Sequence, residues 1–260
     1  MMVLVSQMLR QLPAIARSLC FLSCGALLCC PSLYAQENCQ VEVKLLLAPE
    51  ETRTAVAALG GKKGMTGRIY FFDTGALELL SQGVIVRLRQ GSKSDLTVKL
   101  RLPAGKKFSG QPERLDGFKC EADQTQEGAK SSYSITRRLA IKEIPQAGTD
   151  VFRMLSSAQI KLLEDAHVSV DWTGVKRIAE ITSTDWRTQS QPHLGRLTME
   201  LWEWPRGKVL EISTRVSTDA GSSTYAALQQ LVETKQLVMS RDQRVKTTIA
   251  LEAITRGAAH

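Results

Sequence analysis

YFFDTGALELLSQGVIVRLR, residues 70–89, places two extended segments on either side of a short helical turn. The first, RIYFFDT at 68–74, and the second, VIVRLRQ at 84–90, are rich in the β-branched and aromatic residues that favour strands. Arg87 and Arg89 stand two residues apart in the second segment, so their side chains leave the same face of it. Because the intervening residues are apolar, this stretch predicts a strand with one charged face and one apolar face.

The same alternation occurs in QVEVKLLL at 40–47. Glu42 and Lys44 share one face of this predicted strand, and Val41 and Val43 share the other. Runs of this kind predict five more strands, at 95–102, 116–123, 174–184, 194–204 and 208–216. The sequence therefore predicts eight strands in all.

Helices are predicted between the strands, at 49–61, 149–166 and 222–237. The stretch 124–132 is predicted to be a polar connection, and 133–144 fits neither the helical nor the strand period clearly. Eight strands that are mostly sequence neighbours, with a few helices inserted, predict an α+β fold built as a largely antiparallel, eight-stranded β-barrel. No repeat or linker divides the chain, so one domain is expected at 36–260.

The first 35 residues have the layout of a secretory signal, because they lack Asp and Glu, carry Arg10 and Arg17, and then run into an apolar segment at 18–30. Ala35 is the small residue at which cleavage is expected. The apolar segment is shorter than the roughly 20 residues of a membrane span, although a retained anchor and a lipidated N-terminus are alternatives. We therefore expect residues 1–35 to be a signal peptide and the protein to be periplasmic or secreted, with no membrane span after cleavage.

Cys39 and Cys120 are the only cysteines beyond this segment. An even pair in an oxidising compartment predicts one disulfide. Two separate buried thiols are the alternative, since unpaired cysteines are often buried.

The charge of the chain favours an anionic ligand. Without the two arginines of the signal it keeps 32 basic and 26 acidic residues, a net charge of +6. The histidines His167, His193 and His260 lack the spacing of a zinc site, and no glycine-rich phosphate loop occurs. The aromatic residues, 5% of the chain, do not alternate with the basic ones, so no nucleic-acid surface is expected.

Polar residues share one face in most of the other predicted strands. These faces carry Thr97, Lys99 and Arg101; Lys119, Glu121 and Asp123; Arg196, Thr198 and Glu200; and Glu211, Ser213 and Arg215. On an ordinary antiparallel sheet such faces meet solvent. A barrel with a charged interior would instead need its apolar outer face covered by the inserted helices. Taken alone, the alternation slightly favours the solvent-facing arrangement.

The order of the motifs along the chain decides between charged faces that meet solvent and charged faces that line the barrel interior. QVEVK, then YFFDTGALELLSQGVIVRLR, LTVKLR, FKCEAD, LTMELWEW and KVLEIS resemble the CYTH superfamily, the triphosphate tunnel metalloenzymes, over roughly residues 40–250. The resemblance implies an antiparallel tunnel whose charged lumen holds a triphosphate. Basic side chains would grip the phosphates, and carboxylates would hold Mg²⁺ or Mn²⁺.

Carried over residue by residue, the resemblance implies three sets of site residues. Lys44 and Glu42 would be catalytic. Phosphate binding would fall to Arg87, Arg89, Lys99, Arg101, Lys119, Arg177 and Lys246. Metal binding would fall to Glu42, Glu121, Glu200 and Glu211. The sequence has Gln40 and Ser213 where the family has two more carboxylates, which should weaken metal binding more than phosphate binding.

The resemblance implies a metal-dependent hydrolase of triphosphate or polyphosphate, a candidate triphosphatase that acts on phosphoric anhydrides. The alternative is a catalytically weak module that binds phosphorylated or other anionic molecules. An adenylyl cyclase ranks third, because an exported protein would rarely meet ATP. The missing carboxylates leave open whether the tunnel is an enzyme.

Overall fold

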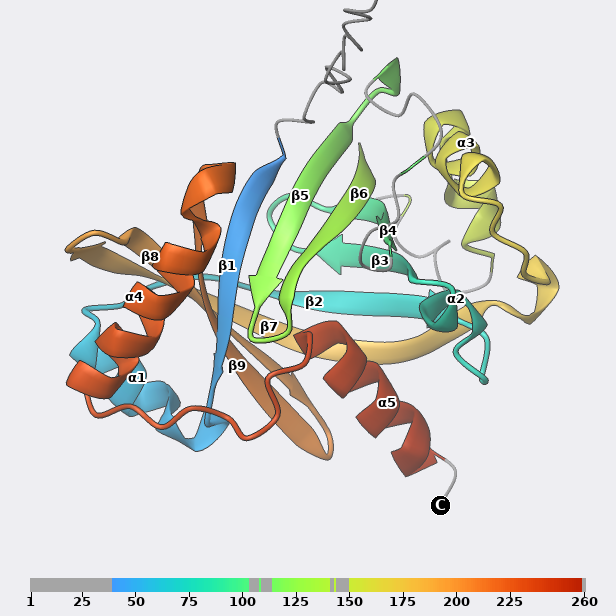
Figure 1. The fold of residues 1–260 in the computed structure, drawn as a ribbon. Helices are drawn as coiled ribbons and strands as arrows, with labels where there is room; N and C mark the ends of the chain where they lie inside the picture. Colours follow the sequence, from blue (N-terminus) through green and yellow to red (C-terminus); the bar gives the residue numbers. More distant parts are fainter. Residues whose placement is uncertain (1–38, 103–107, 109–113, 141–142, 144–149, 259–260) are drawn as a thin grey trace, which may run out of the picture. The chain divides into compact units, whose positions relative to one another are not determined.

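The structure is a computed structural model, and it describes residues 39–102, 108, 114–140, 143 and 150–258. The predicted signal peptide at 1–35 lies outside these residues. Nine described strands close into one barrel in the order β1-β5-β6-β4-β3-β2-β7-β8-β9 (Figure 1). They are β1 (Gln40–Leu47), β2 (Lys62–Asp73), β3 (Val84–Gln90), β4 (Asp95–Arg101), β5 (Phe118–Thr125), β6 (Gly128–Arg138), β7 (Lys176–Gln191), β8 (Gly195–Trp204) and β9 (Gly207–Val216).

The predicted α+β barrel is confirmed, with two differences of detail. The strand beyond the predicted eight is β6, in the stretch 128–138 that the sequence divided between a polar connection and an unassigned segment. Its inward positions carry Ser132, Ser134 and Thr136, and Tyr133 and Ile135 are the only large apolar residues that alternate with them, so the period of two covers a short stretch of the strand. The barrel closes between β1 and β5, which run parallel, whereas all other neighbouring strands are antiparallel.

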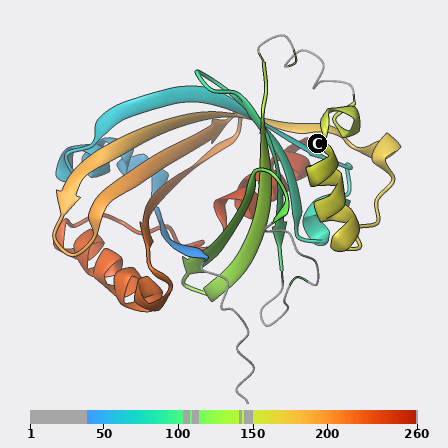
Figure 2. The same ribbon diagram turned by 90° about the horizontal axis from the view of Figure 1, so that it is seen from above.

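Helices cover the outer, apolar faces of the strands (Figures 1 and 2). The described α-helices are α1 (Thr52–Ala58), α2 (Glu78–Ser81), α3 (Ser157–Asp165), α4 (Gly221–Thr234) and α5 (Lys246–Ala258). Beneath α1 and α4 the apolar face of β1 is buried, with Val43 packed in one cluster with Leu59 and Leu228. Covering of this kind lets the opposite face of each strand stay polar.

A second outer cluster lies under α3, where Leu162 packs with Leu88 and Val98. The helix begins later than the sequence predicted, because Ser156 forms a capping box with Gln159 at its first turn. The buried Gln159 amide also donates to two strand carbonyls, those of Leu96 and Ile135. This side chain therefore locks α3 to the barrel wall.

The interior of the barrel is apolar at one end only. Ile69, Phe71, Ile181 and Trp202 point inward there and pack against Leu251 of α5. The remaining inward positions are mostly charged, so the lumen has an apolar end, which α5 covers, and a polar end. None of the helices in the described ranges is long and apolar enough to cross a membrane.

A disulfide joins Cys39 and Cys120, whose Cα atoms lie 4.8 Å apart although 81 residues separate them in sequence. Cys39 precedes β1 and Cys120 belongs to β5, so the bond ties together the two parallel strands that close the barrel. Cys120 packs against the outer apolar cluster, which keeps the bond off the lumen.

Candidate functional site

The charged part of the lumen is built from alternate residues of the strands that enclose it. Lys44 of β1 and Lys99 and Arg101 of β4 are each less than a fifth exposed, and Asp123 of β5 is 2% exposed. Charged side chains are rarely buried to this degree unless they are paired. These groups therefore face an enclosed interior and not the outer surface.

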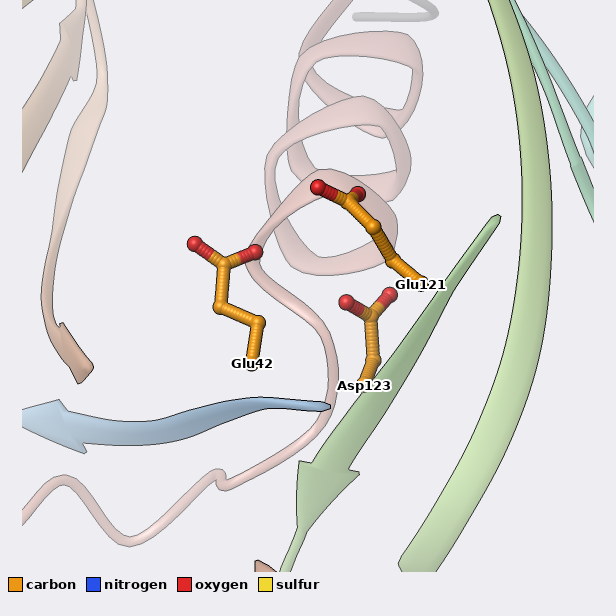
Figure 3. A group of neighbouring side chains, drawn as sticks. All are labelled: Glu42, Glu121 and Asp123. Atoms are coloured by element: carbon orange, nitrogen blue, oxygen red, sulfur yellow. The ribbon is translucent and has the colours of Figure 1, made fainter. Parts of the chain in front are cut away.

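Three carboxylates meet at the seam between β1 and β5 (Figure 3). The parallel register places Glu42 beside Asp123, and Glu121 lies two residues earlier on the same face of β5. One oxygen of each carboxylate lies within 4.8 Å of the other two. Because like charges at this separation repel, the group needs a cation among or beside its members.

Basic side chains of the protein supply that positive charge. Lys44 Nζ lies 2.6 Å from Asp123 Oδ1 and 3.0 Å from Glu42 Oε2. On the other side, Lys99 Nζ lies 3.3 Å from Asp123 Oδ2 and 3.4 Å from Glu121 Oε2. Arg101 Nε completes the set at 3.4 Å from Asp123. Asp123 is thus the centre of a network of three cations.

The network shifts the pKa values of its members. Burial alone would raise the pKa of Asp123, but Lys44, Lys99 and Arg101 outweigh it and hold that pKa well below its usual range. Burial alone would lower the pKa of Lys44, yet Asp123 and Glu42 raise it above its usual range. Burial does lower the pKa of Lys99, with Asp123 opposing the shift. The carboxylate Asp123 and the ammonium group of Lys44 therefore stay charged at neutral pH.

A second cluster lies on the strands next to β1, formed by Glu200 of β8, Glu211 of β9 and Lys246 at the first residue of α5. Lys246 Nζ contacts Glu200 directly and lies 2.7 Å from Glu211 Oε1. It also sits 4.6 Å from the ring centroid of Trp202. Ser183 donates a hydrogen bond of 2.7 Å to Glu200. The helix that covers the apolar end of the lumen thus also supplies a counterion to this acidic pair.

Arg87 and Arg89 project from the inward face of β3 into the same lumen. Arg89 lies 3.9 Å from Glu200, at the limit of an ion pair. Burial lowers the pKa of Arg87 to about 9, so its guanidinium remains charged at neutral pH. Within the described residues Arg87 Nε is buried without a hydrogen-bond partner, and no ion pair is found for this side chain. A guanidinium whose buried Nε lacks a partner is a natural binding group for an anion.

Two of the predicted phosphate-binding residues lie apart from these clusters. Lys119 shares the polar face of β5 but is exposed. Arg177 of β7 is 49% exposed, lies 3.9 Å from Glu180 and packs over the ring of Tyr70. The structure therefore does not bring Lys119 or Arg177 together with the lumen network.

The predicted metal ligands divide between the two clusters. Glu42 and Glu121 lie together with Asp123, whereas Glu200 and Glu211 lie together around Lys246. Asp123 was not among the predicted ligands, although it has the same strand parity as Glu121, which is the signal that could have identified it. Carboxylate oxygens at this spacing match the preference of Mg²⁺ and Mn²⁺, so the donor set of the seam fits such an ion.

A cavity of about 290 Å³ opens beside the seam. Its lining includes Glu42 of the acidic cluster, Arg196 and Thr198 of β8, and Ser213 and Arg215 of β9. A solvent-accessible space thus reaches one of the three carboxylates.

Comparisons with known proteins support the fold. Neither the models of known families nor the curated proteins include a match. Among solved structures the chain resembles HpAC1 of Hippeastrum, a candidate adenylyl cyclase described as having a dominant triphosphatase activity, with a TM-score of 0.58, 16% identity, and 84% of this chain and 96% of that chain covered. It also resembles a candidate adenylate cyclase from Bacillus halodurans, with a TM-score of 0.55, 15% identity and coverage of 80% and 95%. The chain therefore shares its fold with these two structures, in agreement with the barrel that its motifs predicted.

Proposed function

We propose that the lumen binds a triphosphate or polyphosphate chain and hydrolyses it with the help of a divalent metal. The observation that carries the proposal is the guanidinium of Arg87, whose Nε atom is buried without a hydrogen-bond partner in the described part of the chain and which lies in the same lumen as the carboxylate cluster of Glu42, Glu121 and Asp123. The triphosphatase activity described for a protein of the same fold agrees with this substrate class.

Different residues would bind the phosphate chain and the metal. Arg87 and Arg89 would grip the phosphate oxygens, because guanidinium groups bind them with paired hydrogen bonds. Glu42, Glu121 and Asp123 would hold Mg²⁺ or Mn²⁺, which polarises a phosphoryl group and orients the attacking water. The three carboxylates are themselves held in place by the buried ammonium and guanidinium groups around Asp123. We further propose that the protein works outside the cytoplasm, as its N-terminal sequence predicts.

A binding module without turnover is the second candidate. It is favoured because the carboxylates already have internal cations as partners, among them Lys44 at the seam and Lys246 in the second cluster. Gln40 and Ser213 also leave fewer carboxylates than the sequence resemblance implies. In this case the lumen would capture its anion without metal.

Phosphate release from tripolyphosphate, measured with and without Mn²⁺, separates the two candidates. The hydrolase predicts metal-dependent release that falls roughly 10- to 100-fold in Arg87→Gln, since a charge-assisted hydrogen bond is worth about 1.5–3 kcal/mol. Arg153→Gln is the matched control, because Arg153 is 86% exposed. Saturable, metal-independent binding without release would replace the hydrolase by the binding module. Absence of both binding and release would refute the two together.

A further inference from the structure

Arg215 of β9 reaches the seam from the strand next to β1. Its Nη2 atom lies 3.5 Å from Glu42 Oε1 and 3.5 Å from Glu121 Oε1, so one guanidinium nitrogen bridges two of the three clustered carboxylates. The antiparallel register places Arg215 directly beside Glu42. Burial alone would raise the pKa of Glu42, but Lys44 and then Arg215 lower it. Arg215 thus supplies positive charge to the oxygens that fit a metal.

This arginine differs from the other cations of the cluster in its freedom to move. Its side chain is 59% exposed, whereas those of Lys44, Lys99 and Arg101 are 11–16% exposed and are anchored on the buried Asp123. An exposed ion pair is weak enough to be exchanged for another partner.

The surroundings of Arg215 leave room for such an exchange. It lines both the cavity of about 290 Å³ that reaches Glu42 and a second cavity of about 440 Å³. Ser213 lines the first and Gln40 the second. Gln40 and Ser213 stand where the sequence resemblance implies carboxylates. Both residues therefore border the space next to Arg215.

We propose that Arg215 is a built-in competitor of the divalent metal. In the free protein its guanidinium neutralises Glu42 and Glu121 and lowers their affinity for the ion. When an anionic phosphate chain enters, Arg215 turns to the phosphate oxygens and releases the carboxylates. This inference rests on the proposed function of the lumen, because it assigns Arg215 to the entry of the same ligand.

Competition of this kind couples the two ligands. A phosphate chain that draws Arg215 away makes the carboxylates more available, so it strengthens metal binding, and metal strengthens binding of the phosphate chain by the same factor. Without Arg215 the carboxylates are available from the start. The coupling carried by the arginine is then lost.

Mn²⁺ binding measured by titration calorimetry on the full chain tests this directly. We expect Arg215→Gln to tighten Mn²⁺ binding roughly tenfold, because a unit charge a few Å from a divalent ion weakens its binding by about this factor even with water-like screening. Arg215→Lys keeps the charge and should remain near the wild-type affinity. Arg196→Gln is the matched control: Arg196 is exposed and lines the same cavity, but no ion pair is found for it in the described part of the chain. It should change the affinity less than twofold.

A second titration measures the Mn²⁺ affinity with tripolyphosphate already bound. Bound tripolyphosphate should raise this affinity in the wild type and should raise it less in Arg215→Gln. Unchanged or weaker Mn²⁺ binding by Arg215→Gln would overturn the proposal, as would an equal gain in Arg196→Gln. Absence of Mn²⁺ binding in every variant would overturn it too. Phosphate release, which tests the hydrolase itself, is measured separately, so the two failures remain distinct.

Discussion

Replacement of Lys246 by methionine tests the organisation of the lumen most severely. Glu200 and Glu211 are direct neighbours across β8 and β9, and both contact Lys246. Their side chains are 18% and 7% exposed, so water cannot replace the lost ammonium group. Removal of one partner from a buried ionic cluster costs about 3–5 kcal/mol, and the residual exposure of Glu200 places the expected loss near 3 kcal/mol. For a domain of this size such a loss lowers Tm by roughly 6–12 °C.

The loss of stability in Lys246→Met should depend on pH. In the wild type, burial alone would raise the pKa of Glu200, but Lys246 and then Arg89 hold it well below its usual range. Its ionised form therefore stabilises the fold above about pH 4.3, and this stability is lost as the pH falls through the lower folded value. In Lys246→Met, burial and Glu211 instead raise the pKa of Glu200, so the variant loses stability as the pH rises. The gap between the two proteins should be widest at neutral pH and should narrow toward pH 4.

Urea unfolding at pH 7 and pH 4.5 measures this gap, with the m-value as the check that the unfolded state is unchanged. Lys161→Met is the control, because Lys161 is 53% exposed and its ion pair is with Asp165 in the same helix, so its loss should cost less than about 1 kcal/mol. The variant Glu200→Gln with Lys246→Met should recover part of the stability. A Lys246→Met protein as stable as the control at pH 7, or a gap that widens in acid, would contradict the assignment of Lys246 as the counterion of this pair.

Three further predictions follow from the contacts. Cys39→Ser should destabilise the protein by about 2–4 kcal/mol, because the disulfide to Cys120 closes a long loop across the β1–β5 seam, and chemical reduction of the wild type should lower its denaturation midpoint equally. Leu228→Ala, on the buried face of α4, should cost about 2–5 kcal/mol in urea unfolding, and a smaller loss would mean that α4 does not pack on β1. Arg177→Gln should leave the affinity for tripolyphosphate unchanged in calorimetry, since Arg177 lies outside the lumen network; a tenfold loss would place it in the site.

Much of the polar wall could be predicted from sequence because strand alternation is local. A period of two sets which residues share a face, and it grouped Lys99 with Arg101 and Glu121 with Asp123 before any strand was placed. The motif order from 40 to 250 then indicated the barrel, and with it the side of each strand that faces inward. The strand β6 was missed because only Tyr133 and Ile135 supply large apolar residues to its outer face, so its alternation is short.

The amino-acid sequence by itself determined the amphipathic faces of most strands, because the alternation of side chains is a property of neighbouring residues. Only the tertiary structure decided which charges neutralise one another. Lys44 and Asp123 are 79 residues apart, and Lys246 comes from a helix 46 residues beyond Glu200. These partners meet because the barrel closes through the parallel β1–β5 pair and because α5 packs over its apolar end, and neither event leaves a periodic pattern in the sequence.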